Sequence, residues 1–146
     1  MTTDRHLFGL FCDDIRQEVG NKLSLMGCYG PDLVVDALPA VLPRLCVQIR
    51  LVTPKARPCE RAVIRLFMND DDLLGELEIP VAEMNKQITN SDETTRLTYM
   101  SIMTFTPFAF EKEGVLRLEA ETETGVIRGS RLRLKRRGEA VPTTAD

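Results

Sequence analysis

The sequence has 146 residues, of which 43% are hydrophobic and 28% charged, a composition that is typical of a folded domain and excludes a largely disordered chain. Its net charge of -3 argues against a nucleic-acid binder that depends on overall positive charge. No stretch approaches the roughly 20 apolar residues of a membrane span, and residues 1–14 lack the features of a secretory signal. We therefore expect one cytoplasmic domain over residues 1–138 and a short disordered tail over 139–146.

Apolar and polar side chains alternate with a period of two over most of the chain, which is typical of β-strands that bury one face. Turn-forming residues, such as Gly20-Asn21, separate these segments. The pattern predicts an all-β fold, a two-sheet antiparallel sandwich of seven or eight strands, immunoglobulin-like rather than C2-like. The predicted strands cover residues 7–13, 22–29, 45–51, 62–68, 73–79, 97–110, 115–123 and 126–135.

Two segments interrupt this alternation. Residues 31–44 contain three prolines and predict a long crossover that packs on the edge of the sandwich. Residues 80–94 begin with a proline, and we expect one short helical turn at 81–86 followed by an exposed loop.

The last two predicted strands form a hairpin whose register must keep both apolar faces in the core. Because side chains alternate between faces, this requirement predicts a loop of odd length at residues 124–126. It also places Glu119 and Glu121 beside Arg131 and Arg133, so that much of the basic last strand is neutralised across the hairpin.

The residues needed for catalysis are scarce. His6 is the only histidine, and it lies beside the terminus rather than next to a candidate nucleophile. The four cysteines, at 12, 28, 46 and 59, have no metal-ligand spacing. We expect Cys12, Cys28 and Cys46 to be reduced and to act as small buried hydrophobes. No glycine-rich phosphate loop occurs. We therefore expect neither an enzyme nor a cofactor.

An acidic segment resembles one loop of calcium-binding C2 domains over residues 69–80, where an aspartate-rich turn leads into a strand ending in Ile79-Pro80. The resemblance implies calcium ligands, and calcium requires oxygens from at least one further loop. Asp13-Asp14 or Asp92-Glu93 could supply that loop, but the motif expected in an earlier C2 loop is absent. The alternative is a simple Asn/Asp hairpin turn. The candidate ligands are Asp70, Asp71 and Asp72.

The basic run that ends the last strand offers a second candidate surface. Arg136 and Arg137 lie beyond the paired part of the hairpin, so they are the candidate contacts for phosphate or for an acidic partner. The alternative is a solvated strand whose charges prevent edge-to-edge aggregation.

The N-terminal run Phe11-Cys12-Asp13-Asp14-Ile15-Arg16 is the most distinctive part of the chain, together with Gly20-Asn21-Lys22 and Leu25-Met26-Gly27-Cys28-Tyr29. This pattern resembles a family of small, functionally uncharacterised bacterial and prophage-associated proteins. The resemblance covers nearly the whole length and implies a β-rich body, but no activity or cofactor.

Within that run, Asp13, Asp14 and Arg16 form the third candidate site. They are either an ion-paired turn between the first two strands or a polar recognition site at one end of the sandwich.

Three functions remain open on this evidence. The first is a non-catalytic protein-binding or assembly module, with a protein partner or self-association, because some strands carry apolar side chains on both faces. The second is an accessory structural protein of a phage or prophage particle. The third is a calcium-dependent, C2-like adaptor for lipids or membranes. None of the three requires nucleic acid.

Overall fold

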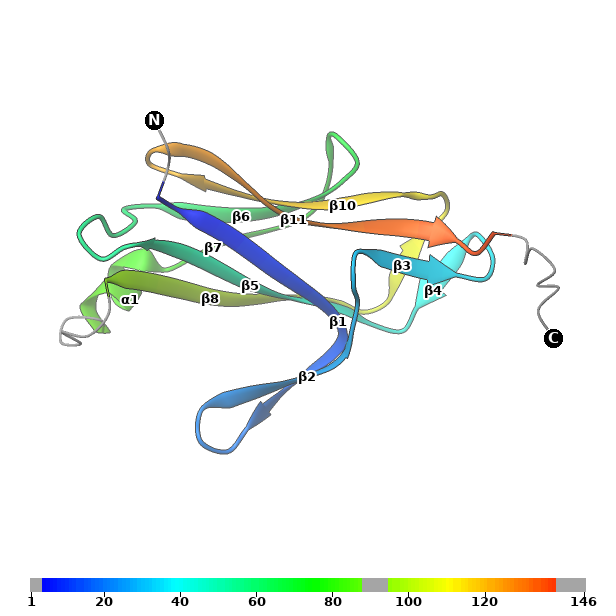
Figure 1. The fold of residues 1–146 in the computed structure, drawn as a ribbon, viewed down its shortest axis with the longest axis horizontal. Coiled ribbons are helices and arrows are strands. Elements are labelled where there is room, and N and C mark those ends of the chain that lie inside the picture. The colour runs from blue at the N-terminus through cyan, green and yellow to red at the C-terminus, as the bar shows by residue number, and fades with distance from the viewer. Residues whose placement is uncertain (1–3, 88–94, 139–146) are drawn as a thin grey trace, which may run out of the picture.

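The computed structural model describes residues 4–87 and 95–138, and within them it is an all-β, sandwich-like arrangement (Figure 1). The predicted fold class is therefore confirmed. The described residues contain more strands than predicted, and one helix, α1 (Val81–Gln87), where a helical turn was expected. The strands are β1 (His6–Glu18), β2 (Lys22–Cys28), β3 (Asp32–Val35), β4 (Ala40–Leu42), β5 (Leu45–Pro54), β6 (Ala62–Met68), β7 (Asp72–Glu78), β8 (Arg96–Phe105), β9 (Phe108–Phe110), β10 (Gly114–Thr122) and β11 (Gly125–Arg136).

Two main sheets form the layers of the sandwich. One has the strand order β2-β1-β5-β8, the other has the order β3-β11-β10-β6-β7, and β4 and β9 form a separate pair. The segments β1-β5-β8 and β11-β10-β6-β7 follow the immunoglobulin strand orders A-B-E and G-F-C-C′. The inter-sheet disulfide of antibody domains has no counterpart, because all four cysteines are free.

Alternating side chains of the two sheets fill the core between the layers. Ile49 and Leu51 of β5 are fully buried, as are Ile64 and Leu66 of β6. Each partner strand contributes in the same way, because residues spaced by two face one side of a sheet. The face of the β2-β1-β5-β8 sheet that points away from this core is called the outer face below.

The proline-rich segment 31–44 differs from the prediction. It contains β3 and β4 rather than a strandless crossover, and β3 pairs with β11 in parallel, so the sandwich is not purely antiparallel. An ion pair between Asp32 and Arg133 (2.6 Å) accompanies this parallel pairing. The predicted strand over 97–110 is divided into β8 and β9 at Thr106-Pro107. The expected loop at 88–94 and tail at 139–146 lie outside the described residues.

The terminal hairpin also corrects a prediction. Thr122 pairs with Gly125, so the loop has two residues rather than an odd number. A register shift between Arg117 and Glu119 restores the inward direction of the apolar side chains, because a bulge changes the parity of the pairing. As a result, Glu119 lies opposite Arg128 rather than beside Arg131.

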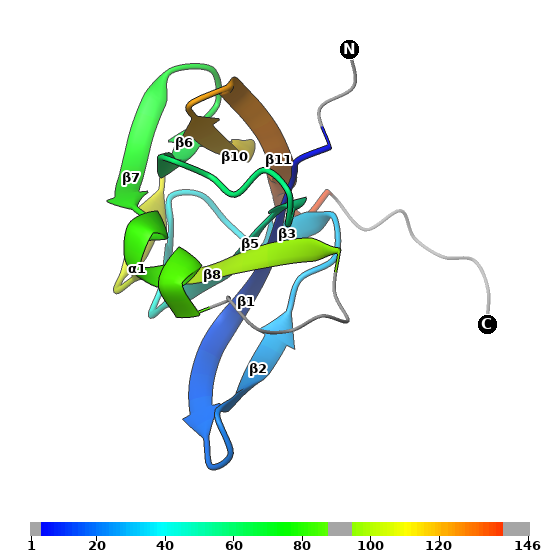
Figure 2. The ribbon, with the colours of Figure 1, turned by 90° about the vertical axis from the view of Figure 1, so that its left-hand side faces the viewer.

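Strand β1 is longer than predicted, and its second half leaves the sandwich. It pairs with β5 from His6 to Cys12, and beyond Cys12 the described residues pair it with β2 alone. Figures 1 and 2 show the resulting two-stranded hairpin projecting from the body, and β2 is the edge strand of its sheet. Residues 13–27 are called the arm below.

Candidate binding surface

The root of the arm is built around Asp13, which lies within β1, as the predicted strand over 7–13 has it, and not in an ion-paired turn, one of the two interpretations of this segment. Its carboxylate accepts a hydrogen bond from the Tyr29 hydroxyl and packs over Gly27 on the neighbouring strand. Gly27 has a φ of 67°, and a Cβ atom there would clash with a carboxylate oxygen of Asp13. Only glycine fits this position, both because of its backbone conformation and because of the carboxylate above it.

Asp14 is fixed from two sides. Its carboxylate accepts hydrogen bonds from Arg44 (2.8 Å) and from the backbone N–H of Ile15 (2.9 Å). The Arg44 hydrogen bond is the main cause that lowers the pKa of Asp14 below its usual value, with a smaller contribution from the charge of Arg16. The ion pair therefore exists, but its partner is Arg44, which the sequence did not single out. Arg16 itself is exposed on the arm.

Three cysteines lie side by side across the strands at this root. The register pairs Cys12 of β1 with Cys28 of β2 on one side and with Cys46 of β5 on the other. Cys12 and Cys46 are buried, as predicted, but Cys28 is exposed, because β2 is the edge strand there. Burial, followed by the neighbouring cysteines, raises the pKa of Cys12 to about 11.

The outer face carries large apolar side chains that remain open to solvent. The exposed fractions are 54% for Phe8, 43% for Leu10, 42% for Met100 and 40% for Ile102. The two-sided apolar pattern of β8 predicted such a face. A patch of this kind on a sheet is typical of a surface that another molecule covers.

A groove of about 520 Å³ lies between the arm and this outer face, and it is called the arm groove below. Its apolar lining includes Leu10, Leu23 and Leu25. Among the lining residues the charged ones are both basic, Lys22 and Arg50. The sequence did not predict this groove, because it depends on the direction in which the arm leaves the sandwich.

The outer edge of β2 has little protection against pairing with another strand. From Leu23 to Cys28 this strand has no charged residue and no proline. By contrast β7, at the edge of the other sheet, carries Asp72, Glu76 and Glu78. Charges on edge strands are a common means of preventing edge-to-edge pairing, so β2 is the less protected of these two edges.

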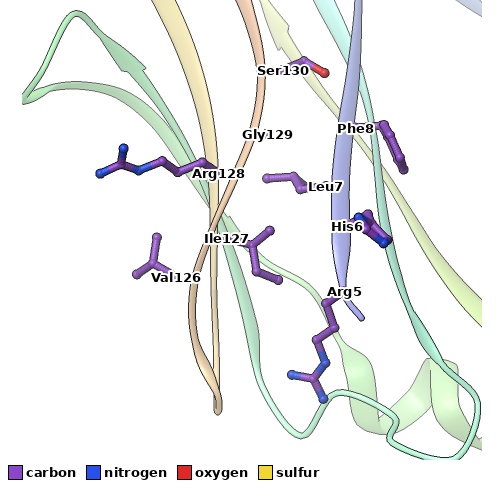
Figure 3. Close-up of a pocket in the computed structure, with 9 residues that line it drawn as sticks. All are labelled: Arg5, His6, Leu7, Phe8, Val126, Ile127, Arg128, Gly129 and Ser130. Atoms are coloured by element: carbon purple, nitrogen blue, oxygen red, sulfur yellow. The ribbon is translucent and has the colours of Figure 1, made fainter. Parts of the chain in front are cut away.

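A second groove, of about 570 Å³, lies between β1 and β11 (Figure 3). Leu7 points towards β11 beside Gly129, whereas His6 and Phe8 point to the opposite side of β1. The hydroxyl of Ser130 accepts a hydrogen bond from the Gly9 N–H (2.9 Å), which ties the two sheets together. His6 and Ser130 line the same groove but do not form a catalytic pair. The groove marks the place where β1 and β11 join the two sheets.

The Asp-rich turn is held by an arginine. The side chain of Arg117 donates to the backbone oxygens of Asn69 and Asp70, both at 2.6 Å, and Asn69 has a φ of 59°. This arrangement fits the hairpin-turn interpretation, in which a cation already satisfies the turn oxygens. Within residues 4–87 and 95–138, Asp70, Asp71 and Asp72 belong to no group of three or more acidic, histidine or cysteine residues that could hold a metal ion.

The basic end of β11 is partly neutralised, though not by the glutamates of β10. Arg137 lies 3.4 Å from Asp36, and the backbone N–H of Arg136 donates to Glu113 (2.9 Å). The predicted neutralisation across the hairpin is therefore wrong in its partners, because β3 supplies the facing acid for Arg133. Arg136 and Arg137 are exposed, on β11 and directly after it.

These features define a class of protein, an immunoglobulin-like β-sandwich that carries a projecting hairpin arm and an exposed apolar sheet face. A family model covers residues 7–135, and the chain belongs to that family, DUF6941, a family of unknown function. This match confirms the expected membership of a functionally uncharacterised family. A search of curated proteins found no match. Among the described residues no helix is long and apolar enough to cross a membrane.

Proposed function

We propose that this chain is a non-catalytic assembly module that binds a second copy of itself through the outer edge of β2. The observation that carries the proposal is the arm, a two-stranded hairpin whose outer edge has no charged residue from Leu23 to Cys28. An isolated two-stranded hairpin is marginally stable in water, so a projecting one gains stability when another strand covers it.

A second copy can pair with this edge without bringing two like charges opposite one another. Lys22 is the only charged residue of β2, so an antiparallel β2–β2 pair across a twofold axis at Leu25 sets Lys22 opposite Cys28. Such a pair would join two four-stranded sheets through backbone hydrogen bonds, the mode known as β-augmentation. The apolar outer faces would then lie on one continuous sheet.

The twofold pairing also assigns the β2 groups that would make this contact. With the axis at Leu25, Ser24 of one chain lies opposite Met26 of the other, and we place the outward N–H groups at these two residues. Those of Leu23 and Leu25 then point towards β1, because N–H groups alternate in direction along a regular strand segment.

Sedimentation velocity over a range of concentrations tests the proposal. We expect the wild-type chain to form dimers and Ser24→Pro to remain monomeric, because proline removes an outward N–H without removing a bond to β1. Ser24→Ala is the matched control and should still form dimers. A wild-type chain that stays monomeric, or a Ser24→Pro variant that is folded and still dimeric, would contradict the proposal.

A calcium-dependent adaptor is a weaker candidate, because the aspartate-rich turn and the arm extend from different sheets (Figure 1). An accessory role in a phage particle would also use self-assembly. It therefore makes the same prediction about the edge of β2.

A further inference from the structure

We propose that Cys12 and Cys28 are a redox-active pair, which a small-molecule disulfide such as oxidised glutathione converts into a cross-strand disulfide at the root of the arm. The inference does not depend on the proposed self-association. It rests on the register of three neighbouring strands and on the unequal exposure of the two thiols.

The pairing geometry favours this bond. The hydrogen bond from the Tyr29 N–H to the Phe11 carbonyl marks those two residues as a hydrogen-bonded pair. Cys12 and Cys28 are the next pair along the antiparallel strands, so they form a non-hydrogen-bonded pair, in which side chains approach most closely. Cβ atoms in such pairs are about 4.5 Å apart, within reach of the 3.5 to 4.5 Å that a disulfide requires.

The other neighbour, Cys46, is less well placed. The Gly9 N–H donates to Ser130, on the side of β1 away from β5. Alternation along β1 then directs the Cys12 N–H towards β5, which makes Cys12 and Cys46 a hydrogen-bonded pair. Cβ atoms in these pairs are about 5.5 Å apart, too far for a relaxed disulfide.

The difference in exposure sets the order of the reaction. Cys28 is exposed and its thiolate can attack oxidised glutathione, forming a mixed disulfide and releasing one glutathione thiolate. Cys12 then loses its proton, attacks the Cys28 sulfur and expels the second glutathione thiolate. Two protein thiols are oxidised, one glutathione disulfide is reduced, and the two protons end on the two glutathiones.

The raised pKa of Cys12, about 11 because of its burial, makes the second step slow at neutral pH and faster as the pH increases. The product closes a covalent loop around the whole arm, residues 13–27. Such a loop restricts the opening of the hairpin, so we expect the arm to become more rigid when it is oxidised.

Incubation with oxidised glutathione at several pH values, followed by peptide mapping without reduction, tests the inference. We expect a Cys12–Cys28 linkage with the loss of two hydrogen atoms from the mass, and amide exchange in the arm that is about tenfold slower. Cys46→Ala should retain the linkage, and Cys28→Ser should lose it. The buried thiols of Cys46 and Cys59 remain reduced in the expected product.

Three results would overturn the inference: a Cys12–Cys46 linkage, a stable mixed disulfide at Cys28, or a disulfide between the Cys28 residues of two chains. The same reaction on the Ser24→Pro variant separates this inference from the proposed assembly. A linkage that forms in a monomeric variant supports the redox pair whether or not the chain forms dimers.

Discussion

The two halves of β1 share one strand conformation but have different surroundings. From His6 to Cys12 the strand pairs with β5 and buries Leu7 and Phe11 in the core, whereas from Asp13 to Glu18 it pairs with β2 alone in the described structure. The body is held by buried side chains and the arm by a few polar contacts at its root. Stability is therefore concentrated in the body, and the proposed contact edge lies on the arm.

The largest expected effect lies in the body, at Arg5. This buried guanidinium forms an ion pair with Glu123 (2.5 Å) and donates to Thr53 (2.9 Å). Arg5→Ala leaves a partly buried carboxylate without its partner, so we expect a loss of about 3–5 kcal/mol in the free energy of unfolding. Chemical denaturation measures it. The matched control is Arg57→Ala, which breaks an exposed ion pair with Asp4 and should cost less than about 1 kcal/mol.

The next effect concerns Tyr99, which is fully buried on β8. Its hydroxyl accepts a hydrogen bond from the Cys59 N–H (3.0 Å) and donates to Asn85 of α1 (2.6 Å). Tyr99→Phe leaves the Cys59 N–H without this partner, and we expect a loss of about 1–3 kcal/mol in thermal or denaturant unfolding. A change below about 0.5 kcal/mol would mean that water replaces the hydroxyl.

Acidification should weaken the body through Glu123. Burial alone would raise the pKa of this carboxyl group, but hydrogen bonds from Arg5 and from backbone N–H groups lower it from 4.5 to about 2. The stabilisation is thus complete above about pH 4.5 and is lost as the pH falls towards 2. Denaturation at several pH values gives the free energy of unfolding of wild type and of Glu123→Gln, and the two values should converge at low pH. A difference that stays constant with pH would contradict the lowered pKa of Glu123.

At the root of the arm, Gly27 combines a positive φ with close packing against Asp13, and a matched variant separates the two effects. Gly27→Ala must adopt a positive φ and also displaces the Asp13 carboxylate, so we expect a cost of about 1–3 kcal/mol. Gly20→Ala is the matched control, because Gly20 also has a positive φ but open space around it. Amide exchange in the arm should accelerate more in Gly27→Ala than in Gly20→Ala. Equal acceleration would show that the contact with Asp13 is unimportant.

The smallest expected effect belongs to Asp14. Its ion pair with Arg44 is screened by solvent, so Asp14→Ala should lower the free energy of unfolding only slightly, less than any of the changes above. Because its carboxylate is already bonded within the chain, we expect dimer formation to persist. A variant that remains stable but no longer forms dimers would instead make Asp14 a recognition residue.

The sequence predicted the strands of the body well, because core residues such as Ile49 and Leu51, or Ile64 and Leu66, recur with a spacing of two. It did not predict β3 and β4, which are short and lie among prolines. It also missed the arm, because periodicity shows that a segment is a strand but not where its neighbouring strand ends. In this fold β5 begins at Leu45, opposite the start of the arm.

The cysteine pair was within reach of the sequence. Cys12 and Cys28 are equally far from Gly20, so a three-residue turn centred on Gly20 sets them opposite one another, in the register that pairs Glu18 with Lys22. Spacing rules for metal sites do not reveal such a pair. The ion pair between Asp14 and Arg44 could not be predicted in this way, because it depends on the register between β1 and β5.

The central claim, that the outer edge of β2 is a contact surface, is tested most directly by residue-resolved amide exchange at low and high protein concentration. We predict that the outward N–H groups of Ser24 and Met26 become protected as the concentration increases. Those of Leu23 and Leu25, which the proposed pairing directs towards β1, should be protected at both concentrations. Exchange at Ser24 and Met26 that does not change with concentration, in a chain that forms dimers, would contradict the claim.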